Sequence, residues 1–279
     1  MQRVNRVKLI ALDMDGTLLA GDHWTVPQDN VLAIRRAHEA GIHVCICTGR
    51  VLEDASDFAH RLGLPVMIIG SNGSRAADAP LPEGRIFYRR DFEPDTAKDV
   101  LDSISDLGLM VNVFEDGHVS TLPSEAYPEY HLAKRRLVRV DYGRDAIYAA
   151  ASRGIMKIFV VGAVEEETRV GLIRNRLRSE FPTLSISCSS PHNIEIVPPD
   201  SGKGAALHSM AQHLGLTREE VMAVGDAQND LSMLEYAYHS VAMGNAEEAV
   251  RCVCRYQTAT NDECGVARII ERVLASREA

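Results

Sequence analysis

The sequence has 279 residues, of which 46% are hydrophobic, 25% charged and 5% aromatic, a composition typical of globular proteins rather than of disordered, collagen-like or disulfide-rich chains. A chain of this length can bury a large core and commonly divides into two units. Its formal net charge of −9 argues against nucleic-acid and anionic-membrane partners, which require a basic surface, so any phosphate-binding site must concentrate positive charge locally.

The N-terminal apolar run, Leu9–Leu12, ends at Asp13 and is too short for an export signal. Longer uncharged apolar runs such as Ile158–Val164 are still too short to span a bilayer. The cysteines favour buried thiols in a reducing compartment over a zinc site: Cys45, Cys47, Cys188, Cys252, Cys254 and Cys264. We therefore expect a cytoplasmic protein without a membrane partner.

The first part of the chain alternates strand and helix signals. The pattern predicts a strand over Val7–Leu12, a helix from Pro27 to Gly41, a strand over Ile42–Cys47, a helix over Leu52–Leu62 and a strand over Val66–Ile69. Continuous apolar strands separated by amphipathic helices indicate a parallel sheet covered on both faces.

Residues 79–84 form a cluster of turn residues, after which the pattern changes. The next segment predicts a hairpin of Leu109–Phe114 and His118–Leu122, strands over Ile155–Gly162 and Leu184–Cys188, and a helix over Glu165–Phe181. Strand and helix alternation returns with a helix over Lys203–Leu214, a strand over Val221–Gly225, a helix over Asp230–Ala237 and a strand over Ser240–Met243. We expect an α/β fold in which residues 1–84 and 191–279 form a Rossmann-like, doubly wound parallel sheet and residues 85–190 form an inserted α+β domain.

Two carboxylates, Asp13 and Asp15, directly follow the first strand in the segment Asp-Met-Asp-Gly-Thr. Ligands of open parallel sheets bind beyond the carboxyl ends of the strands, so both side chains are candidates for the active site. One can act as a nucleophile while the other transfers protons. The alternative is a turn in which Asp and Gly only supply backbone geometry.

Three further polar segments occupy comparable positions, and each has a structural alternative. Thr48-Gly49-Arg50 ends the second strand and is typical of a phosphate-binding corner, but also of a plain helix entry. Lys203 begins a predicted helix and is either a phosphate ligand or a surface lysine. Asp226 and Asp230, in Gly-Asp-Ala-Gln-Asn-Asp, offer oxygen ligands for magnesium, or else form a polar loop with Asp230 as a helix cap.

Together these segments resemble the haloacid dehalogenase-like superfamily of phosphotransferases, and the inserted domain is similar to that of the Cof-type sugar-phosphate phosphatases. Three more segments contribute to the resemblance: Ser71-Asn72-Gly73, Asn193–Pro198 and Asn261–Val266. The resemblance covers the whole chain, with its most specific segments outside residues 85–190.

The resemblance implies that Asp13 attacks phosphorus and becomes an aspartyl-phosphate. Asp15 would protonate the leaving alcohol and later deprotonate the hydrolytic water. Mg²⁺ would be the cofactor, held by Asp13, Asp226 and the backbone carbonyl of Asp15. Asp230 would orient Lys203 or a water on the metal.

Several residues are expected to bind the phosphate or the substrate: Thr48, Gly49, Arg50, Asn72, Lys203 and Asn229. For Arg50 a surface ion pair is an equal alternative. The inserted domain would be a cap that determines substrate specificity. For its polar residues of interest, His118, Tyr127, Tyr130 and His131, we favour structural roles.

The sequence thus predicts a Mg²⁺-dependent phosphatase of small phosphorylated metabolites, with sugar phosphates as the favoured substrates. The alternatives are a phosphomutase or other phosphotransferase of the same superfamily, and a protein that binds a phosphorylated ligand without turnover. The expected partner is a small phosphomonoester, with no nucleic acid or membrane, and the chain is expected to be a monomer or a weak homo-oligomer.

Overall fold

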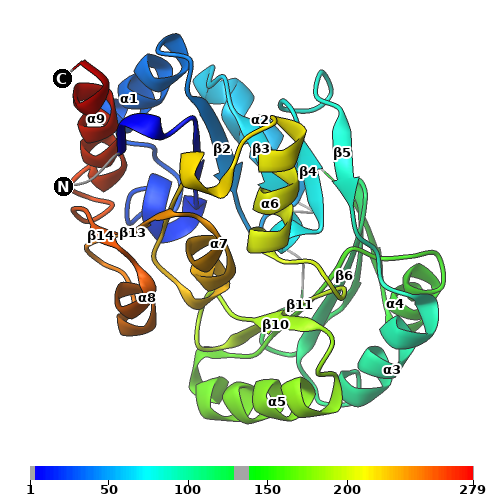
Figure 1. The fold of residues 1–279 in the computed structure, drawn as a ribbon. Coiled ribbons are helices and arrows are strands. Elements are labelled where there is room, and N and C mark those ends of the chain that lie inside the picture. The colour runs from blue at the N-terminus through cyan, green and yellow to red at the C-terminus, as the bar shows by residue number, and fades with distance from the viewer. Residues whose placement is uncertain (1–3, 129–137, 279) are drawn as a thin grey trace. The chain divides into compact units, whose positions relative to one another are not determined.

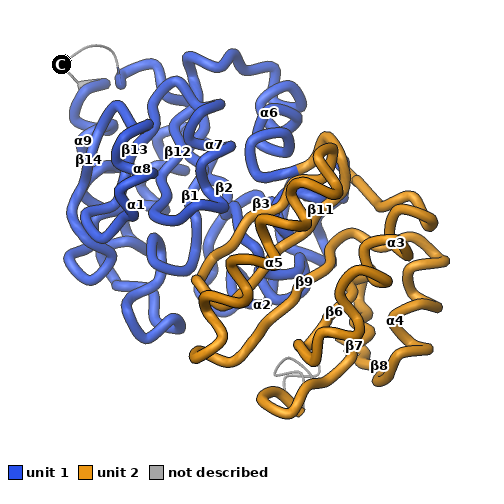
Figure 2. Tube along the Cα trace, turned by 90° about the horizontal axis from the view of Figure 1, so that it is seen from below, with its two compact units in different colours: residues 1–88, 202–279 blue, residues 89–201 orange. Residues whose placement is uncertain are grey.

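The computed structural model describes residues 4–128 and 138–278, which form two compact units. The first unit comprises residues 1–88 and 202–279, and the second comprises residues 89–201 (Figure 2). Each has its own hydrophobic core, one running from Val7 to Leu274 and the other from Phe92 to Ile196. Tyr130 and His131 lie outside the described residues.

The first unit is built on a sheet in the order β14-β13-β12-β1-β2-β3-β4-β5. Figure 1 labels the outer strands of this sheet, β2 to β5 on one side and β13 and β14 on the other. The strands from β14 to β3 are parallel, and β4 pairs antiparallel to β3. Their bounds are Leu9–Leu12 (β1), His43–Cys47 (β2), Met67–Gly70 (β3), Arg75–Ala77 (β4), Ile86–Arg89 (β5), Val221–Gly225 (β12), His239–Ala242 (β13) and Tyr256–Gln257 (β14). This confirms the predicted doubly wound sheet.

Six α-helices of the described chain belong to the first unit: α1 (Gln28–Glu39), α2 (Leu52–Leu62), α6 (Lys203–His213), α7 (Leu231–Tyr236), α8 (Glu248–Val253) and α9 (Gly265–Glu278). α1 packs against α9, and α6 packs against α7. The predicted helix over Leu52–Leu62 matches α2, which Gly63 ends in the left-handed conformation. α8, α9 and β14 were not predicted from the sequence.

The second unit contains a six-stranded sheet in the order β10-β11-β9-β6-β7-β8. All its pairs are antiparallel except β7 with β8. Its elements are β6 (Met110–Glu115), β7 (His118–Leu122), β8 (Arg139–Tyr142), β9 (Lys157–Val161), β10 (Ser185–Ser187), β11 (Asn193–Val197), α3 (Pro94–Ile104), α4 (Arg144–Ala151) and α5 (Glu167–Glu180). The insert is therefore an α+β unit, as predicted.

Both boundaries of the second unit lie later in the chain than the expected limits at residues 84 and 190. β5 forms the edge of the first sheet, so the first unit extends to Tyr88. β11 pairs with β9 and β10, which places it in the second sheet, and the first unit resumes only at Gly202. The Pro198-Pro199 pair follows β11 directly and precedes this return.

Candidate active site

The turn after β1 places Asp13 at the carboxyl end of the strands of the first sheet. Asp13 is almost completely buried, and its backbone N–H donates to Val224 of β12 at 3.1 Å. The residues Met14–Leu18 form a π-type turn (η2), in which Gly16 has a φ of 86°. A Cβ at Gly16 would lie 2.3 Å from a carboxylate oxygen of Asp226. Only glycine therefore allows this turn to approach Asp226 so closely.

β1 and β12 are neighbours in the sheet. The strand that follows β1 in the chain, β2, lies on one side of this pair, and the strand that follows β12, β13, lies on the other. The carboxyl ends of such strands form the usual ligand-binding crevice of an open parallel sheet. Asp13 follows β1, and Asp226 follows β12. The topology therefore places both carboxylates at the position where a ligand is expected.

Lys203, at the start of α6, is fully buried and joins two of the aspartates. Its Nζ lies 2.6 Å from Oδ1 of Asp13 and 2.7 Å from Oδ1 of Asp230. The interpretation of Lys203 as a surface lysine is therefore wrong. Burial by itself lowers the pKa of Lys203, but the Asp13 and Asp230 carboxylates outweigh burial and raise that pKa well above its usual value.

Asp226 and Asp230 are held by different partners. Thr17 donates its hydroxyl to Oδ1 of Asp226 at 2.8 Å, a contact that sequence reasoning missed although Thr17 belongs to the first motif. The second carboxylate oxygen of Asp230 accepts the backbone N–H groups of Asp226 and Ala227 at 2.9 and 3.2 Å. Asp230 thus uses both oxygens within the protein, and it shapes the loop that carries Asp226.

The cluster contains an excess of negative charge. Oxygens of Asp13, Asp226 and Asp230 all lie within 4.8 Å of one another, against the single ammonium group of Lys203. Burial and the neighbouring Asp230 carboxylate raise the pKa of Asp13 well above its usual value. The same two causes raise the pKa of Asp226 to about 7. A divalent cation would relieve this repulsion, and hard carboxylate oxygens suit a small one, so the residues present fit a metal site.

Asp15 makes different contacts from Asp13. Its carboxylate accepts two hydrogen bonds from Arg50, from Nε at 3.0 Å and from Nη2 at 2.6 Å. Nη1 of Arg50 lies 3.6 Å from Asp54, and Nδ1 of His23 lies 3.5 Å from Asp15. Burial lowers the pKa of Arg50, but its bonds to Asp15 raise it overall. The ion-pair alternative for Arg50 is thus observed, and its partner is a candidate catalytic residue.

The remaining predicted residues lie at the ends of neighbouring strands. Thr48 and Gly49 follow β2; Thr48 is buried, and its hydroxyl accepts the backbone N–H of Arg50 at 3.1 Å. Asn72 lies in a tight turn (η3, Ser71–Gly73) after β3, and its N–H donates to the Thr48 carbonyl at 3.1 Å. Asn229 lies in η7 (Gln228–Asp230), next to Asp230.

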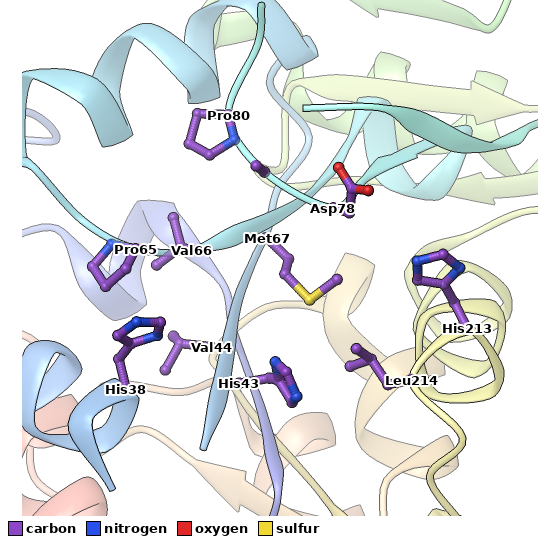
Figure 3. Close-up of a pocket in the computed structure, with 11 residues that line it drawn as sticks. His38, His43, Val44, Pro65, Val66, Met67, Asp78, Pro80, His213 and Leu214 are labelled. Carbon is purple, nitrogen blue, oxygen red and sulfur yellow. The ribbon is translucent and has the colours of Figure 1, made fainter. Parts of the chain in front are cut away.

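A pocket of the first unit lies at the other end of the strands. Its volume is about 460 Å³, and its lining includes His38, His43, Met67, Asp78 and His213. His43 and Met67 are the first residues of β2 and β3 (Figure 3). The pocket is therefore distinct from the aspartate cluster, which lies at the carboxyl ends of the strands.

The cysteines are all free, but their burial differs. Cys45, Cys47 and Cys188 are buried, as predicted, whereas Cys252 is exposed. Burial raises the pKa of the Cys47 thiol well above its usual value, so this neighbour of the cluster stays protonated. Within residues 4–128 and 138–278, no helix combines the length and apolar character that crossing a membrane requires.

Comparison with known proteins identifies relatives of the chain. A model of the haloacid dehalogenase-like hydrolases matches residues 10–270. Phosphatase YwpJ of Bacillus subtilis is 31% identical, over 96% of this chain and 100% of that protein. The 5-amino-6-(5-phospho-D-ribitylamino)uracil phosphatase YwtE of the same organism is also 31% identical, over 98% of this chain and 100% of the relative.

The fold is likewise similar to solved structures. A haloacid dehalogenase-like hydrolase from B. subtilis superimposes with a TM-score of 0.82 at 30% identity. The match covers 95% of this chain and 99% of that structure. Both units of the present chain therefore have counterparts in a known fold.

Proposed function

The chain belongs to the haloacid dehalogenase-like hydrolases and is a phosphatase. We propose that it is of their Cof-type subclass and that it hydrolyses phosphorylated sugars or polyols through an aspartyl-phosphate on Asp13. The observation that carries the proposal is the buried cluster of Asp13, Lys203, Asp226 and Asp230 at the carboxyl ends of β1 and β12. This cluster combines a nucleophile, a fixed cation and oxygen ligands for a metal.

Asp13 is the proposed nucleophile, and Lys203 orients it through the bond to Oδ1. The carboxylate attacks phosphorus, the bond from phosphorus to the ester oxygen breaks, and water later hydrolyses the acyl phosphate. The Lys203 ammonium and the Thr48 hydroxyl are suited to the phosphoryl oxygens, where charge accumulates in the transition state. Gly49, Asn72 and Asn229 lie nearby in sequence or at adjacent strand ends and are proposed to line the same site.

Asp15 is the proposed general acid and base. It gives a proton to the leaving alcohol and later takes one from the hydrolytic water, a role typically worth about 10²–10⁴-fold in rate. Arg50 orients its carboxylate through two hydrogen bonds.

Asp13, Asp226 and the carbonyl of Asp15 would hold Mg²⁺, while Asp230 orients Lys203 and the Asp226 loop. When bound, the ion supplies positive charge that allows an anionic carboxylate to approach an anionic phosphoryl group.

The substrate class follows from the resemblance and from one relative. The relative YwtE is named for a substrate with phosphate on a ribityl chain, and sugar phosphates share the same chemistry of a phosphate ester on a polyhydroxylated carbon chain. We propose that the second unit recognises this leaving group, while the first unit carries out the chemistry.

The test is phosphate release by the purified protein from a panel of sugar, polyol and ribitylaminouracil phosphates, with Mg²⁺, with Ca²⁺ and with excess chelator. Mg²⁺ should activate, and chelator should abolish turnover. Ca²⁺ should substitute poorly because its larger and looser coordination shell suits bidentate carboxylates. A requirement for a bisphosphate activator would indicate a mutase instead.

Asp13→Asn tests the nucleophile in the same assay. We expect a loss of about 10⁴-fold or more with the fold retained, because the attacking anion is removed. Asp29→Asn, in the exposed first turn of α1, is the matched control and should retain wild-type turnover. Turnover by Asp13→Asn close to that of the control would exclude covalent catalysis through Asp13.

A further inference from the structure

The loop that follows Asp15 is held by asparagine side chains from distant parts of the chain. Residues 14–18 form a π-type turn that gives way to extended backbone at Leu19, so its last carbonyls have no partner within the turn. Three asparagines donate their Nδ2 groups to carbonyls of the turn and of the residue after it: Asn245 to Gly16 at 2.8 Å, Asn30 to Leu18 at 3.3 Å, and Asn261 to Leu19 at 2.9 Å.

The asparagines are themselves fixed by backbone groups. Oδ1 of Asn245 accepts the N–H of Asn261 at 3.0 Å, and Oδ1 of Asn30 accepts the N–H of Ala267 at 2.9 Å. Each of these two amides therefore donates through nitrogen and accepts through oxygen, which defines its orientation. Asn245 follows β13 and Asn261 precedes α9, so the segment near the C-terminus is joined to the turn after β1.

We propose that Asn245 and Asn261 are positioning residues for Asp15, an inference that rests on the acid–base role of Asp15 in the proposed function. Asp15 and Gly16 are the two residues of the turn with non-helical backbone angles. The Gly16 carbonyl held by Asn245 belongs to the residue directly after Asp15. Fixing that carbonyl restricts the rotation of the backbone that carries the Asp15 side chain.

Asp15 is thereby held from two sides. Arg50 binds its carboxylate, and Asn245 holds the backbone of the next residue. Asn261 supports Asn245 through its N–H and holds Leu19 through its side chain. A general acid must lie within hydrogen-bond reach of the leaving oxygen, and small displacements of such groups reduce rates strongly.

Asn245→Asp is the most selective variant. It keeps an oxygen that accepts the Asn261 N–H, but it replaces the nitrogen that donates to Gly16. Asn245 is exposed, whereas Asn261 is buried, so the substitution avoids the core. Asn245→Ala, which removes both bonds, is the second variant.

The measurement is kcat/KM with Mg²⁺ for an alkyl phosphate, glycerol phosphate, and for an aryl phosphate, 4-nitrophenyl phosphate. For each substrate, kcat/KM reports the steps up to departure of the leaving group. An alkoxide needs a proton to leave, whereas nitrophenolate does not. Both Asn245 variants should lose about 10–100-fold on the alkyl ester and less than about 3-fold on the aryl ester, a smaller version of the pattern expected for Asp15→Asn.

Arg35→Ala is the matched control, since Arg35 also donates from an exposed side chain to a backbone carbonyl of the first unit, that of Leu62 at 2.9 Å. Arg35→Ala should leave kcat/KM unchanged for both substrates. Suppose that Asp15→Asn lowers kcat/KM mainly for the alkyl ester. If the Asn245 variants then lower kcat/KM equally for both esters, or for neither, the positioning role is overturned. If Asp15→Asn is not selective, the acid role fails and the inference with it. Absence of phosphatase activity in the wild type would instead refute the proposed function.

Discussion

Each unit buries a lysine side chain, and the surroundings of the two lysines differ. Lys203 of the first unit contacts Asp13 and Asp230, and Asp226 lies beside them. Lys157 of the second unit pairs with Glu195, whose other oxygen accepts the Ser189 hydroxyl at 2.6 Å.

The ammonium of Lys157 also lies 5.2 and 5.8 Å from the ring centroids of Phe159 and Phe114. In the described part of the chain, Lys203 is therefore outnumbered by carboxylates, while the contacts of Lys157 include a carboxylate and two aromatic rings. A buried excess of negative charge has no structural advantage, because its repulsion opposes folding. The comparison supports the proposal that the first cluster binds a cation and a phosphoryl group, whereas the second pair would stabilise the sheet to which it belongs.

Of the two lysine variants, Lys203→Met is expected to have the larger effect on turnover. Removing the ammonium leaves the phosphoryl oxygens without their fixed cation, so kcat/KM should fall about 10²–10³-fold. The fall in kcat/KM should be equal for polyol and aryl phosphates, because they share the phosphoryl group. A loss confined to one substrate would contradict the assignment of Lys203 to phosphate.

Lys157→Met provides the matched variant in the second unit. It leaves the Glu195 carboxylate buried without its cation, which should lower the free energy of unfolding by about 3–5 kcal/mol in urea denaturation. Turnover of an aryl phosphate by the folded protein should stay within about 3-fold of wild type. The double variant Lys157→Met/Glu195→Leu should recover much of the stability; no recovery would show that the pair does more than balance its own charge.

The pKa of Asp226 predicts how magnesium stabilises the first cluster. The pKa is raised from an ordinary value near 4 to about 7, so the stability due to this carboxyl is present at low pH and is lost as the pH rises through about 7. The pKa of Asp13 is raised as well. Without metal, the Tm should therefore fall between pH 5 and 8 more steeply than in Asp226→Asn.

Because Mg²⁺ binds the ionised carboxylates, it should raise the Tm by at least about 3 °C more at pH 8 than at pH 5. Scanning calorimetry with and without the ion measures both slopes. Equal shifts at the two pH values would contradict a cation site at these aspartates.

The smallest effects are expected from polar residues of the second unit. Asn112, His118 and Tyr127 are candidates for alanine variants, and His118 lies 3.1 Å from Glu115 and 3.0 Å from Asp141. If this unit recognises the leaving group, kcat/KM for polyol phosphates should change unequally, by up to about 10-fold, while aryl phosphate stays within about 2-fold. If all three variants lowered kcat/KM equally for polyol and aryl phosphates, the second unit would contribute to the chemistry itself.

The sequence predicted that Asp13 and Asp226 lie close together, because each directly follows a strand. Parallel strands share one carboxyl edge, so Asp13 and Asp226 could be brought together without knowing the fold in detail. The structure confirms this proximity, although the two residues are separated by most of the chain. Lys203 could be placed only through the family resemblance, since its burial depends on the packing of α6.

Other features depend on tertiary contacts that no local pattern records. β11 was not predicted as a strand, and its pairing with β9 and β10 assigns it to the second unit. The Arg50 bonds to Asp15 and the asparagine contacts to Gly16 and Leu19 join residues far apart in sequence. The buried pair of Lys157 and Glu195 was missed for the same reason, because a charged residue in a strand usually faces solvent.

The central position of β1 has a consequence for synthesis on the ribosome. β1 pairs with β2 on one side and with β12 on the other, and β12 is translated roughly 10–40 s after β1 at about 5–20 residues per second. During this delay one edge of an apolar strand lacks its partner, and such edges recruit other chains. The contiguous second unit can complete its own core in the same interval. Chains truncated before β12 and released from the ribosome should therefore carry a folded insert on an aggregation-prone and inactive first unit.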